Sequence, residues 1–269
     1  MFLKSVGIIG TGCLGEHIAK MLIRRPSLSL KPISVIGSYR DYARRQELGD
    51  IFGPKMVLQR ENILVAKCSD VLIISVKPGQ VKDVCEEINQ IRNLPIICTA
   101  AAVPLDKLHE WVSSSQIIIR CMPNIPCSIG HGVVAYYSKH PDANKIMNEI
   151  FAPNLVISVD NDLQVDTSTL ISGCGPAFFA WYAKCLKQIV TSENPISDDV
   201  INQMIIQTMI GTANMMRTNT CDEIIQTVAS PKGATEATLD SFRSNGIDKE
   251  IIKALIVAQK RINSIATSL

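Results

Sequence analysis

The chain has 269 residues, of which 46% are hydrophobic and 19% charged, with a net charge of +2 at pH 7. This length is sufficient for two domains. A nearly neutral chain with short lysine and arginine clusters lacks the electrostatic footprint of a nucleic-acid-binding protein, so a small-molecule partner is expected. The apolar run after Lys4 is broken by glycines and no later run reaches membrane length, which predicts no membrane partner and a cytoplasmic protein.

Cysteine usage agrees with a reducing compartment. Nine cysteines occur without a C-x-x-C pair, in a chain too large to need disulfide staples. We therefore expect reduced, mostly buried thiols and no metal site. The cysteines stand at positions 13, 68, 85, 98, 121, 127, 174, 185 and 221.

The first part of the chain alternates short apolar runs with amphipathic stretches, the pattern of a parallel sheet covered by helices. We predict a helix from Leu14 to Arg24, stopped by Pro26. Residues 1–160 are therefore predicted to form an α/β domain. Its strands are expected at Val6–Ile9, Ile33–Ile36, Met56–Leu58, Val71–Val76, Ile96–Thr99, Ile117–Cys121, Val133–Tyr136 and Leu155–Val159.

The first predicted strand runs into Gly10-x-Gly12-x-x-Gly15 and then into the first helix. In dinucleotide-binding turns such glycines provide a tight turn, close approach to the pyrophosphate and close helix packing, and the phosphates lie at the positive helix end. Plain turns also contain such glycines, but the flanking strand and helix favour a cofactor. We predict a Rossmann-like domain that binds its cofactor at Gly10, Gly12, Cys13, Leu14 and Gly15.

The end of the second predicted strand indicates which dinucleotide binds. An NAD site usually has an acidic residue there, whereas this chain has Ser38 and Arg40, and Asp41 stands at capping-box spacing for helix initiation. A serine hydroxyl and an arginine fork suit the 2′-phosphate of NADP, so NADPH is the predicted cofactor. Arg44 and Arg45 are expected on a solvated helix face.

After about Asp160 the strand-like runs end, and long helical patterns predict an all-helical domain over residues 161–269. Five such helices expose more apolar surface than one small bundle can usually hide, so we expect dimerisation through this half. A methionine-rich stripe on the second helix is also explained as a core face. The helices are expected at 162–191, 198–217, 221–228, 231–244 and 248–267.

Three turns contain further candidate site residues. Asn124 follows a strand where open α/β sheets bind ligands, although a rigid proline-flanked loop explains it equally well. The small residues of Ser172–Pro176 suit either a ligand or close helix packing. Ser230-Pro231 is a strong N-cap and N1 pair, so the amides that follow are predicted to face outward as a carboxylate receptor, or simply to start a helix.

Four segments taken together resemble Δ1-pyrroline-5-carboxylate reductase. The similarity extends from Gly7 to the last helix. It implies a mostly parallel Rossmann-like domain followed by an all-helical dimerisation domain, with homodimers that can stack into rings. The segments are Asp70–Pro78, Arg120–Pro126, Thr169–Phe178 and Ser230–Thr235.

The resemblance implies an enzyme of proline biosynthesis that reduces 1-pyrroline-5-carboxylate to L-proline by hydride transfer from NADPH. A protonated imine is already electrophilic, so positioning does most of the catalysis, and no histidine pairing suggests acid–base chemistry. By the same resemblance Thr235 bonds the imine nitrogen and Ser230 binds the carboxylate. The other implied substrate residues are Lys232, Gly233, Ala234, Ser172, Gly173 and Cys174, and the other implied cofactor residues are Asn62, Val76, Lys77, Pro78, Ala100, Met122 and Asn124.

The departures from the family pattern cluster on the substrate side. Cys174 and Phe178 replace a serine and a tyrosine, Lys232 replaces a glycine, and Glu236 and Thr227 also differ from the usual residues. A reductase of a larger cyclic imino acid, such as a piperideine carboxylate, would share the cofactor features. A non-catalytic NADP-binding interaction protein is a further alternative. A hydroxyacid dehydrogenase of the 6-phosphogluconate type is disfavoured, because it would need lysine at position 179.

Overall fold

The computed structural model of the protein describes residues 3–25, 33–112, 117–188 and 196–267. By its contacts the chain divides into one unit of residues 1–176 with 259–269 and a second unit of residues 177–258. The two units are described separately below.

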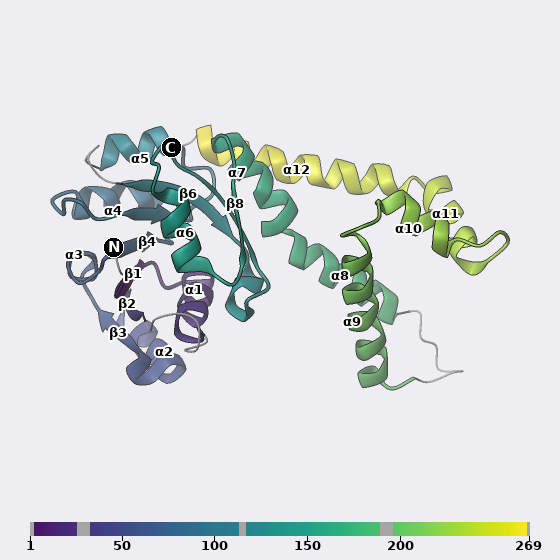
Figure 1. Ribbon diagram of the computed structural model, residues 1–269, viewed down its shortest axis with the longest axis horizontal. Coiled ribbons are helices and arrows are strands. Elements are labelled where there is room, and N and C mark those ends of the chain that lie inside the picture. Colours follow the sequence, from purple (N-terminus) through teal and green to yellow (C-terminus); the bar gives the residue numbers. More distant parts are fainter. Residues whose placement is uncertain (1–2, 26–32, 113–116, 189–195, 268–269) are drawn as a thin grey trace. The chain divides into compact units, whose positions relative to one another are not determined.

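The first unit contains one eight-stranded sheet in the order β3-β2-β1-β4-β5-β6-β7-β8 (Figure 1). Neighbouring strands are parallel except β6 and β7, so β7 and β8 run opposite to the other six. This confirms the predicted, mostly parallel α/β sheet. The strands are β1 Ser5–Ile9, β2 Ser34–Ser38, β3 Met56–Gln59, β4 Val71–Ile74, β5 Ile96–Cys98, β6 Ile118–Pro123, β7 Val133–Tyr137 and β8 Leu155–Ser158.

Helices cover both faces of this sheet. Because side chains alternate along a strand, Ile73 enters one hydrophobic cluster and its neighbour Ile74 the other. The first cluster is completed by α1, α2 and α6, and the second by α3, α4 and α5. These helices are α1 Cys13–Ile23, α2 Tyr42–Phe52, α3 Asn62–Lys67, α4 Val81–Ile88, α5 Leu105–Trp111 and α6 Ala143–Phe151. Pro26, the predicted stop of the first helix, lies outside the described residues.

The C-terminal part of the chain is helical, as predicted, with two differences. The helix expected over 162–191 is interrupted by a π-helical turn at Thr169–Gly173, and its expected last residues lie outside the described ranges. The helix expected from residue 231 begins at Ala234. The helices are α7 Asp162–Ser168, α8 Gly175–Lys187, α9 Asp198–Met215, α10 Cys221–Val228, α11 Ala234–Ser244 and α12 Ile247–Thr267.

The helix α7 groups with the sheet, although its sequence is entirely helical in character. The division by contacts therefore falls after Pro176, while the domain boundary that the sequence predicts at 160 stays a prediction. At the other end of the helical region, residues 259–269 also group with the first unit, where Ile262 is buried.

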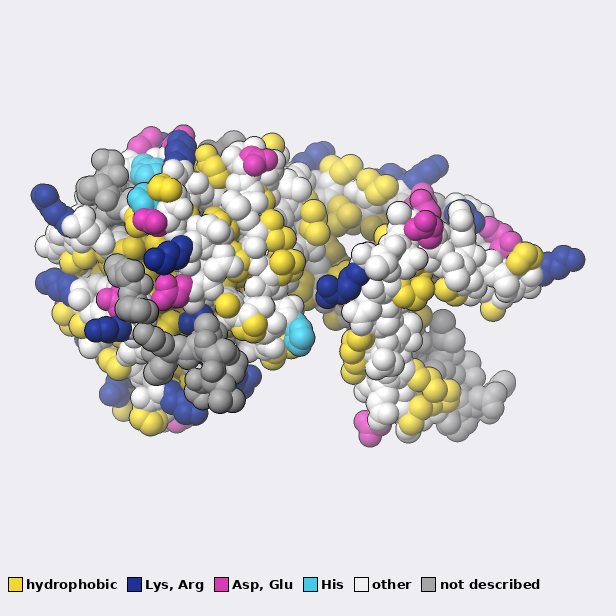
Figure 2. Space-filling model, in the orientation of Figure 1, with side chains coloured by type: hydrophobic (Ala, Val, Ile, Leu, Met, Phe, Trp, Pro, Cys, Tyr) yellow, Lys and Arg dark blue, Asp and Glu magenta, His cyan; other side chains and the backbone are white. Residues whose placement is uncertain are grey.

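The second unit leaves large apolar side chains in solvent. Among its described residues Ile201 is the single buried hydrophobic one, whereas Trp181 and Val257 are 63% and 67% exposed. Figure 2 shows hydrophobic side chains gathered along α9 and α12. Such a surface is typical of a face that associates with another protein surface.

The cysteines are less uniformly buried than expected. Cys85, Cys98, Cys121 and Cys127 are buried, whereas Cys13, Cys68 and Cys221 are exposed and the other two are half-buried. Burial raises the pKa of the Cys85 thiol to about 12 and that of Cys98 to about 11. These thiols stay protonated at neutral pH and act as core residues. The described residues contain no cluster of potential metal ligands, and none of their helices is long and apolar enough to cross a membrane.

Candidate cofactor and substrate site

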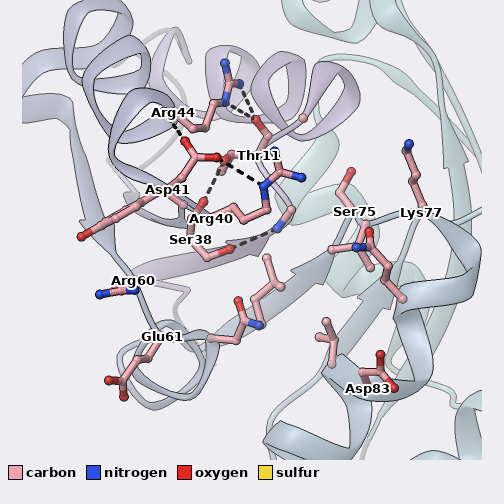
Figure 3. A pocket seen from close by; sticks show the side chains of 18 of the residues that line it. Thr11, Ser38, Arg40, Asp41, Arg44, Arg60, Glu61, Ser75, Lys77 and Asp83 are labelled. Atoms are coloured by element: carbon pink, nitrogen blue, oxygen red, sulfur yellow. Dashed lines mark hydrogen bonds and ion pairs between the residues drawn. The ribbon is translucent and has the colours of Figure 1, made fainter.

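A cleft of about 930 Å³ opens at the carboxyl ends of β1, β2 and β4, where open α/β sheets bind their ligands. Many of the predicted cofactor residues line it, which brings together side chains far apart in the sequence. They are Gly10, Gly12, Ser38, Arg40, Asn62, Val76 and Lys77. Figure 3 shows Ser38 and Arg60 on one side of this cleft and Ser75, Lys77 and Asp83 on the other.

The geometry of the three glycines of the β1–α1 turn is compatible with the roles that the sequence predicts. Gly10 has a φ of +91° and its Cα lies so close to Ser75 that a Cβ would be 2.7 Å from the backbone there. A Cβ on Gly15 would collide with the carbonyl oxygen of Gly10, so this glycine permits close helix packing. A Cβ on Gly12 would meet nothing within 4 Å, which leaves an open path for a pyrophosphate to the backbone.

Ser38 connects the glycine turn to the end of β2. Its side-chain oxygen accepts a hydrogen bond from the backbone N–H of Gly10 at 3.2 Å, and its carbonyl accepts one from the Thr11 hydroxyl at 2.7 Å. Because the Ser38 hydroxyl acts as an acceptor there, its own hydrogen remains available for a ligand. The predicted role as a phosphate donor is therefore compatible with these contacts.

Arg44 contradicts the expectation of a solvated arginine. Its guanidinium donates to the carbonyl oxygen of Thr11 and forms ion pairs with Glu16 at 2.9 Å and Glu47 at 2.8 Å. Burial alone would raise the pKa of Glu16, but hydrogen bonds from Lys20 and Arg44 outweigh it and hold the pKa below its ordinary value. The charge of Arg44 is therefore compensated within the protein, and this residue braces the cofactor turn.

Two other arginines of the cleft remain free for an anion. Arg40 has a 90% exposed side chain and meets Asp41 at 3.3 Å, an ion pair of little strength in water. Asp41 is mainly occupied as the N-cap of α2, where it accepts from the backbone N–H of residue 44. Arg60, which sequence reasoning missed, lines the same cleft and has no ion-pair partner among the described residues. The signal lies in strand pairing, since Gln59 pairs with Ser38 and Arg60 follows.

The hydroxyl of Ser75 is a second feature that sequence reasoning missed. It lines the cleft, and its oxygen is buried without a hydrogen-bond partner among the described residues. A buried polar group without a partner is costly, and most such groups in folded proteins are satisfied by protein, water or ligand. The Ser75 hydroxyl is therefore an unused polar group beside the cleft and a candidate partner for a polar ligand.

Acidic side chains complete the cleft wall on the side of α4. Asn62 donates a hydrogen bond of 2.9 Å from its amide to Glu87, and Asp83 lines the wall one turn before. This bond directs the amide nitrogen of Asn62 toward α4 and leaves its amide oxygen as the group that can accept from a ligand.

A second group of predicted residues meets at the carboxyl end of β6. The amide of Asn124 donates a hydrogen bond of 3.0 Å to the carbonyl oxygen of Ser172. A Cβ on Gly173 would lie 3.8 Å from the Met122 side chain. Residues predicted for the cofactor and for the substrate therefore lie side by side here. Cys174 follows and is half-buried.

The remaining predicted cofactor residues belong to the same unit but not to the wall of the cleft. Cys13 is exposed at the first position of α1, and Leu14 packs on the core beside buried Gly15. Ala100 is 5% exposed and packs in the other core cluster, and Pro78 begins a short 3₁₀ turn.

The predicted substrate turn in the second unit differs from the expected helix start. Ser230 is not the N-cap of α11, which is Gly233, and Pro231 lies before the helix. The N–H of Gly233 instead donates to the carbonyl of Ser230 at 2.9 Å, and Lys232 has a φ of +61°. Proline second and a positive φ third are the pattern of a type II turn. Sequence reasoning chose the helix because the serine–proline pair also suits an N-terminus.

Within this turn the first amide already has an acceptor. The backbone N–H of Lys232 donates to the carboxylate of Glu236 at 2.6 Å. A Cβ on Gly233 would lie 2.9 Å from the carbonyl oxygen and 2.6 Å from the hydroxyl oxygen of Ser230, so a larger residue there would force the turn to shift. Thr235 is half-buried in the first turn of α11. The amides of residues 234 and 235 remain at the positive end of this helix.

Two family models match parts of the chain. A model described as pyrroline-5-carboxylate reductase dimerisation matches residues 162–265. A model described as NADP oxidoreductase, coenzyme F420-dependent, matches residues 5–102. The first supports self-association through the helical region. The second agrees with the cleft and confirms NADP as the predicted cofactor class.

Relatives extend this similarity over both units. A pyrroline-5-carboxylate reductase of Pseudomonas aeruginosa is 29% identical over 212 residues, covering 75% of this chain and 76% of that protein. The reductase of Synechocystis sp. is 28% identical, covering 95% and 96%. The fold is that of Plasmodium falciparum pyrroline carboxylate reductase with NADP bound, at a TM-score of 0.86, 22% identity and 99% coverage of both chains. The resemblance that four motifs indicated is thus confirmed, and over nearly its whole length this chain is similar to the pyrroline-5-carboxylate reductases.

Proposed function

We propose that this chain catalyses the NADPH-dependent reduction of 1-pyrroline-5-carboxylate to L-proline. The observation that carries this proposal is the cleft, where the residues predicted for NADP assemble in a chain similar to these reductases. When bound, NADPH supplies the hydride. The part of the protein is then to bind and orient cofactor and substrate and to exclude competing reactions.

The chain offers separate groups for the two anionic parts of the cofactor. The open backbone at Gly12 and the first turn of α1 suit the pyrophosphate. The Ser38 hydroxyl with the guanidinium groups of Arg40, which is only weakly paired, and of Arg60 suits the 2′-phosphate, because arginine forks bind phosphate oxygens two at a time. The unpartnered hydroxyl of Ser75 gives a further polar contact.

The substrate is assigned to the Ser230–Thr235 turn together with Ser172, Gly173 and Cys174. The free amides at the start of α11 and the Ser230 hydroxyl suit the carboxylate of an imino acid. Thr235, whose hydroxyl lies in that first turn, is assigned the hydrogen bond to the imine nitrogen. The ring is already electrophilic when protonated, so these contacts act by holding its carbon in position for the hydride.

Self-association of the helical region is assigned to a homodimer, in which the exposed apolar side chains of α8, α9 and α12 lie against a second copy. Stacking of such dimers into a ring and a cytoplasmic location complete the proposal. A membrane or nucleic-acid partner forms no part of it.

The test is oxidation of NADPH by the purified protein with 1-pyrroline-5-carboxylate and with a piperideine carboxylate, each product being identified by mass spectrometry. Faster turnover of the five-membered ring, with proline as product, supports the proposal. Faster turnover of the six-membered ring assigns the enzyme to the larger imino acid, through Cys174, Phe178 and Lys232. NADPH binding without oxidation in either case indicates a non-catalytic NADP-binding protein.

A further inference from the structure

We propose that Asn124 and Arg120 are positioning residues: through them β6 holds the Thr169–Gly173 turn in place, so Asn124 acts on the substrate side rather than as a ligand of the cofactor. The consequence for substrate rests on the proposed function, whereas the role of the two side chains in holding the turn does not.

The Asn124 side chain is fixed at both ends. Its amide nitrogen donates to the carbonyl oxygen of Ser172 at 3.0 Å, and its amide oxygen accepts from the N–H of Val133 at 2.9 Å. The thiol of Cys127 lies 3.7 Å from the same oxygen. The residue is only 7% exposed. Its side chain is therefore used to join the Ser172 turn to the start of β7.

The sequence explains why the Ser172 carbonyl needs this donor. In an α-helix it would accept from the N–H of the residue four positions later, which is Pro176 and has no N–H. The turn instead takes the π-helical form, in which the N–H of Cys174 donates to the carbonyl of Thr169 at 2.8 Å. The side-chain amide of Asn124 supplies the N–H donor that Pro176 lacks. Isolated π turns are rare and often occur at functional sites.

Arg120 holds the helix that leads into the turn. Its side chain is 1% exposed and ion-paired with Asp162 at 2.8 Å and, more closely, with Asp166. The same carboxylates accept from the N–H groups of Leu105 and Ala102, at 3.1 Å and 3.3 Å. The guanidinium thus fixes α7 to β6, and the two carboxylates join the same helix to the loop that follows β5. Buried ion pairs often add little net stability, so a role in fixing one arrangement is the better explanation.

The two attachments act on one continuous segment. Arg120 and Asn124 lie four residues apart on β6 and its end, while Asp162, Asp166 and Ser172 lie along α7 and the π turn. The helix and its turn are therefore held at both ends by the same strand. Loosening either attachment is expected to displace Ser172 and Gly173, which carry the predicted substrate contacts, while the cofactor cleft at β1, β2 and β4 keeps its shape.

The decisive variant is Asn124→Asp, which keeps the acceptor for Val133 but places a carboxylate oxygen where the donor to Ser172 was. The matched control is Asn154→Asp, since Asn154 is also 7% exposed and joins Gly132 to Phe151 without touching the turn. Arg120→Lys keeps the charge and removes the fork. Hydrogen exchange by mass spectrometry, NADPH affinity by fluorescence, and KM and kcat for the imine are measured on each.

We expect Asn124→Asp to speed exchange at residues 169–175 and to raise the KM for the imine about tenfold, with NADPH affinity within about twofold, as for one lost hydrogen bond. Arg120→Lys should change the same quantities, and Asn154→Asp neither. Weaker NADPH binding by Asn124→Asp with unchanged exchange would make Asn124 a cofactor ligand and overturn the proposal, as would faster exchange without a change in KM. Should the unmodified chain not reduce the imine, exchange and NADPH affinity still decide the role of Asn124.

Discussion

The hydroxyl of Thr11 donates a hydrogen bond of 2.7 Å to the carbonyl oxygen of Ser38, and the N–H of the neighbouring Gly10 donates to the Ser38 hydroxyl oxygen. The turn that is proposed to bind the pyrophosphate and the residue proposed to bind the 2′-phosphate are therefore one hydrogen-bonded element. Arg44 braces the same element from α2 by donating to the carbonyl of Thr11.

Thr11→Val removes one bond of this element without adding volume. Because the variant disturbs the shape of the turn rather than the phosphate contacts, we expect NADPH and NADH affinity to fall by a similar factor, about 2- to 10-fold for a neutral hydrogen bond. Fluorescence titration with both dinucleotides measures the change. Thr212→Val, which removes an exposed hydroxyl bonded within α9, is the control. A loss confined to NADPH would contradict the expectation.

Arg60→Gln and Arg40→Gln test the assignment of the 2′-phosphate. Each should weaken NADPH binding about tenfold, as for a charged hydrogen bond, and leave NADH binding unchanged. Arg45→Gln, on the exposed side of α2, should change neither. Arg44→Gln should weaken both and lower the melting temperature, because it removes the contact to the Thr11 carbonyl and one of the two ion pairs of Glu16. Equal affinity of Arg60→Gln and the parent protein for NADPH would remove Arg60 from the site.

Ser75→Ala separates a ligand contact from a structural one. The Ser75 hydroxyl has no partner among the described residues, so its removal should leave the melting temperature of the free protein unchanged or slightly higher. The increase in melting temperature on adding NADP should become smaller, since the stabilisation of the folded state by a ligand grows with the logarithm of its affinity. The same increase in the variant and the parent protein would show that Ser75 does not contact the cofactor.

Thr235→Ala should lower turnover of the imine about 10- to 100-fold, the range of a lost hydrogen bond to a charged group, while NADPH affinity is retained. Thr238→Ala is the matched control, because this threonine lies one turn later in α11 and its hydroxyl bonds to the carbonyl of Ala234. Steady-state kinetics and NADPH titration on both variants give the comparison. Unchanged turnover in Thr235→Ala would exclude Thr235 from the reaction.

Asp70 predicts part of the acid sensitivity of the fold. Burial alone would raise the pKa of its carboxyl, but hydrogen bonds from the N–H groups of Lys4 and Ser5 and from the Ser5 hydroxyl outweigh it, so the pKa is lowered. A lowered folded-state pKa gives stability that is present above the unfolded value of about 3.9 and is lost as pH falls through the folded one.

Urea unfolding at a series of pH values from neutral to strongly acidic measures this contribution. Asp70→Asn should lower the free energy of unfolding at neutral pH and make its decline below about pH 4 shallower than in the parent protein. Parallel declines in the two proteins would assign the acid sensitivity to other carboxylates.

The sequence predicted the sheet well because its central strands, β1, β4, β5 and β6, are buried on both faces and therefore form uninterrupted apolar runs. Every predicted strand forms, with ends within two residues of the expected ones. The glycine turn was equally predictable, since Gly10 and Gly15 answer local steric demands. The antiparallel direction of β7 could not be predicted, because an apolar run carries no information on strand direction.

What the sequence did not reveal depends on contacts between distant segments. Arg44 looks like a surface arginine until α2 places it against Thr11 and Glu16. Arg60 gains its position from the pairing of β3 with β2. The start of α11 was misplaced because Ser230-Pro231 suits both a helix N-terminus and a turn, and the bond from Gly233 to Ser230 selects the turn. The π turn could not be predicted either, because it depends on the donor that Asn124 supplies from the end of β6.

The near absence of a core in the second unit has a thermodynamic consequence. Ile201 is the single buried hydrophobic residue among the described residues of this unit, so the unit gains little free energy from folding alone. Its apolar area is removed from water when copies associate. Folding and assembly then form one equilibrium that follows mass action. The free energy of unfolding of this unit therefore depends on the protein concentration and must be quoted with it. Dilution lowers this free energy, as adding a denaturant does.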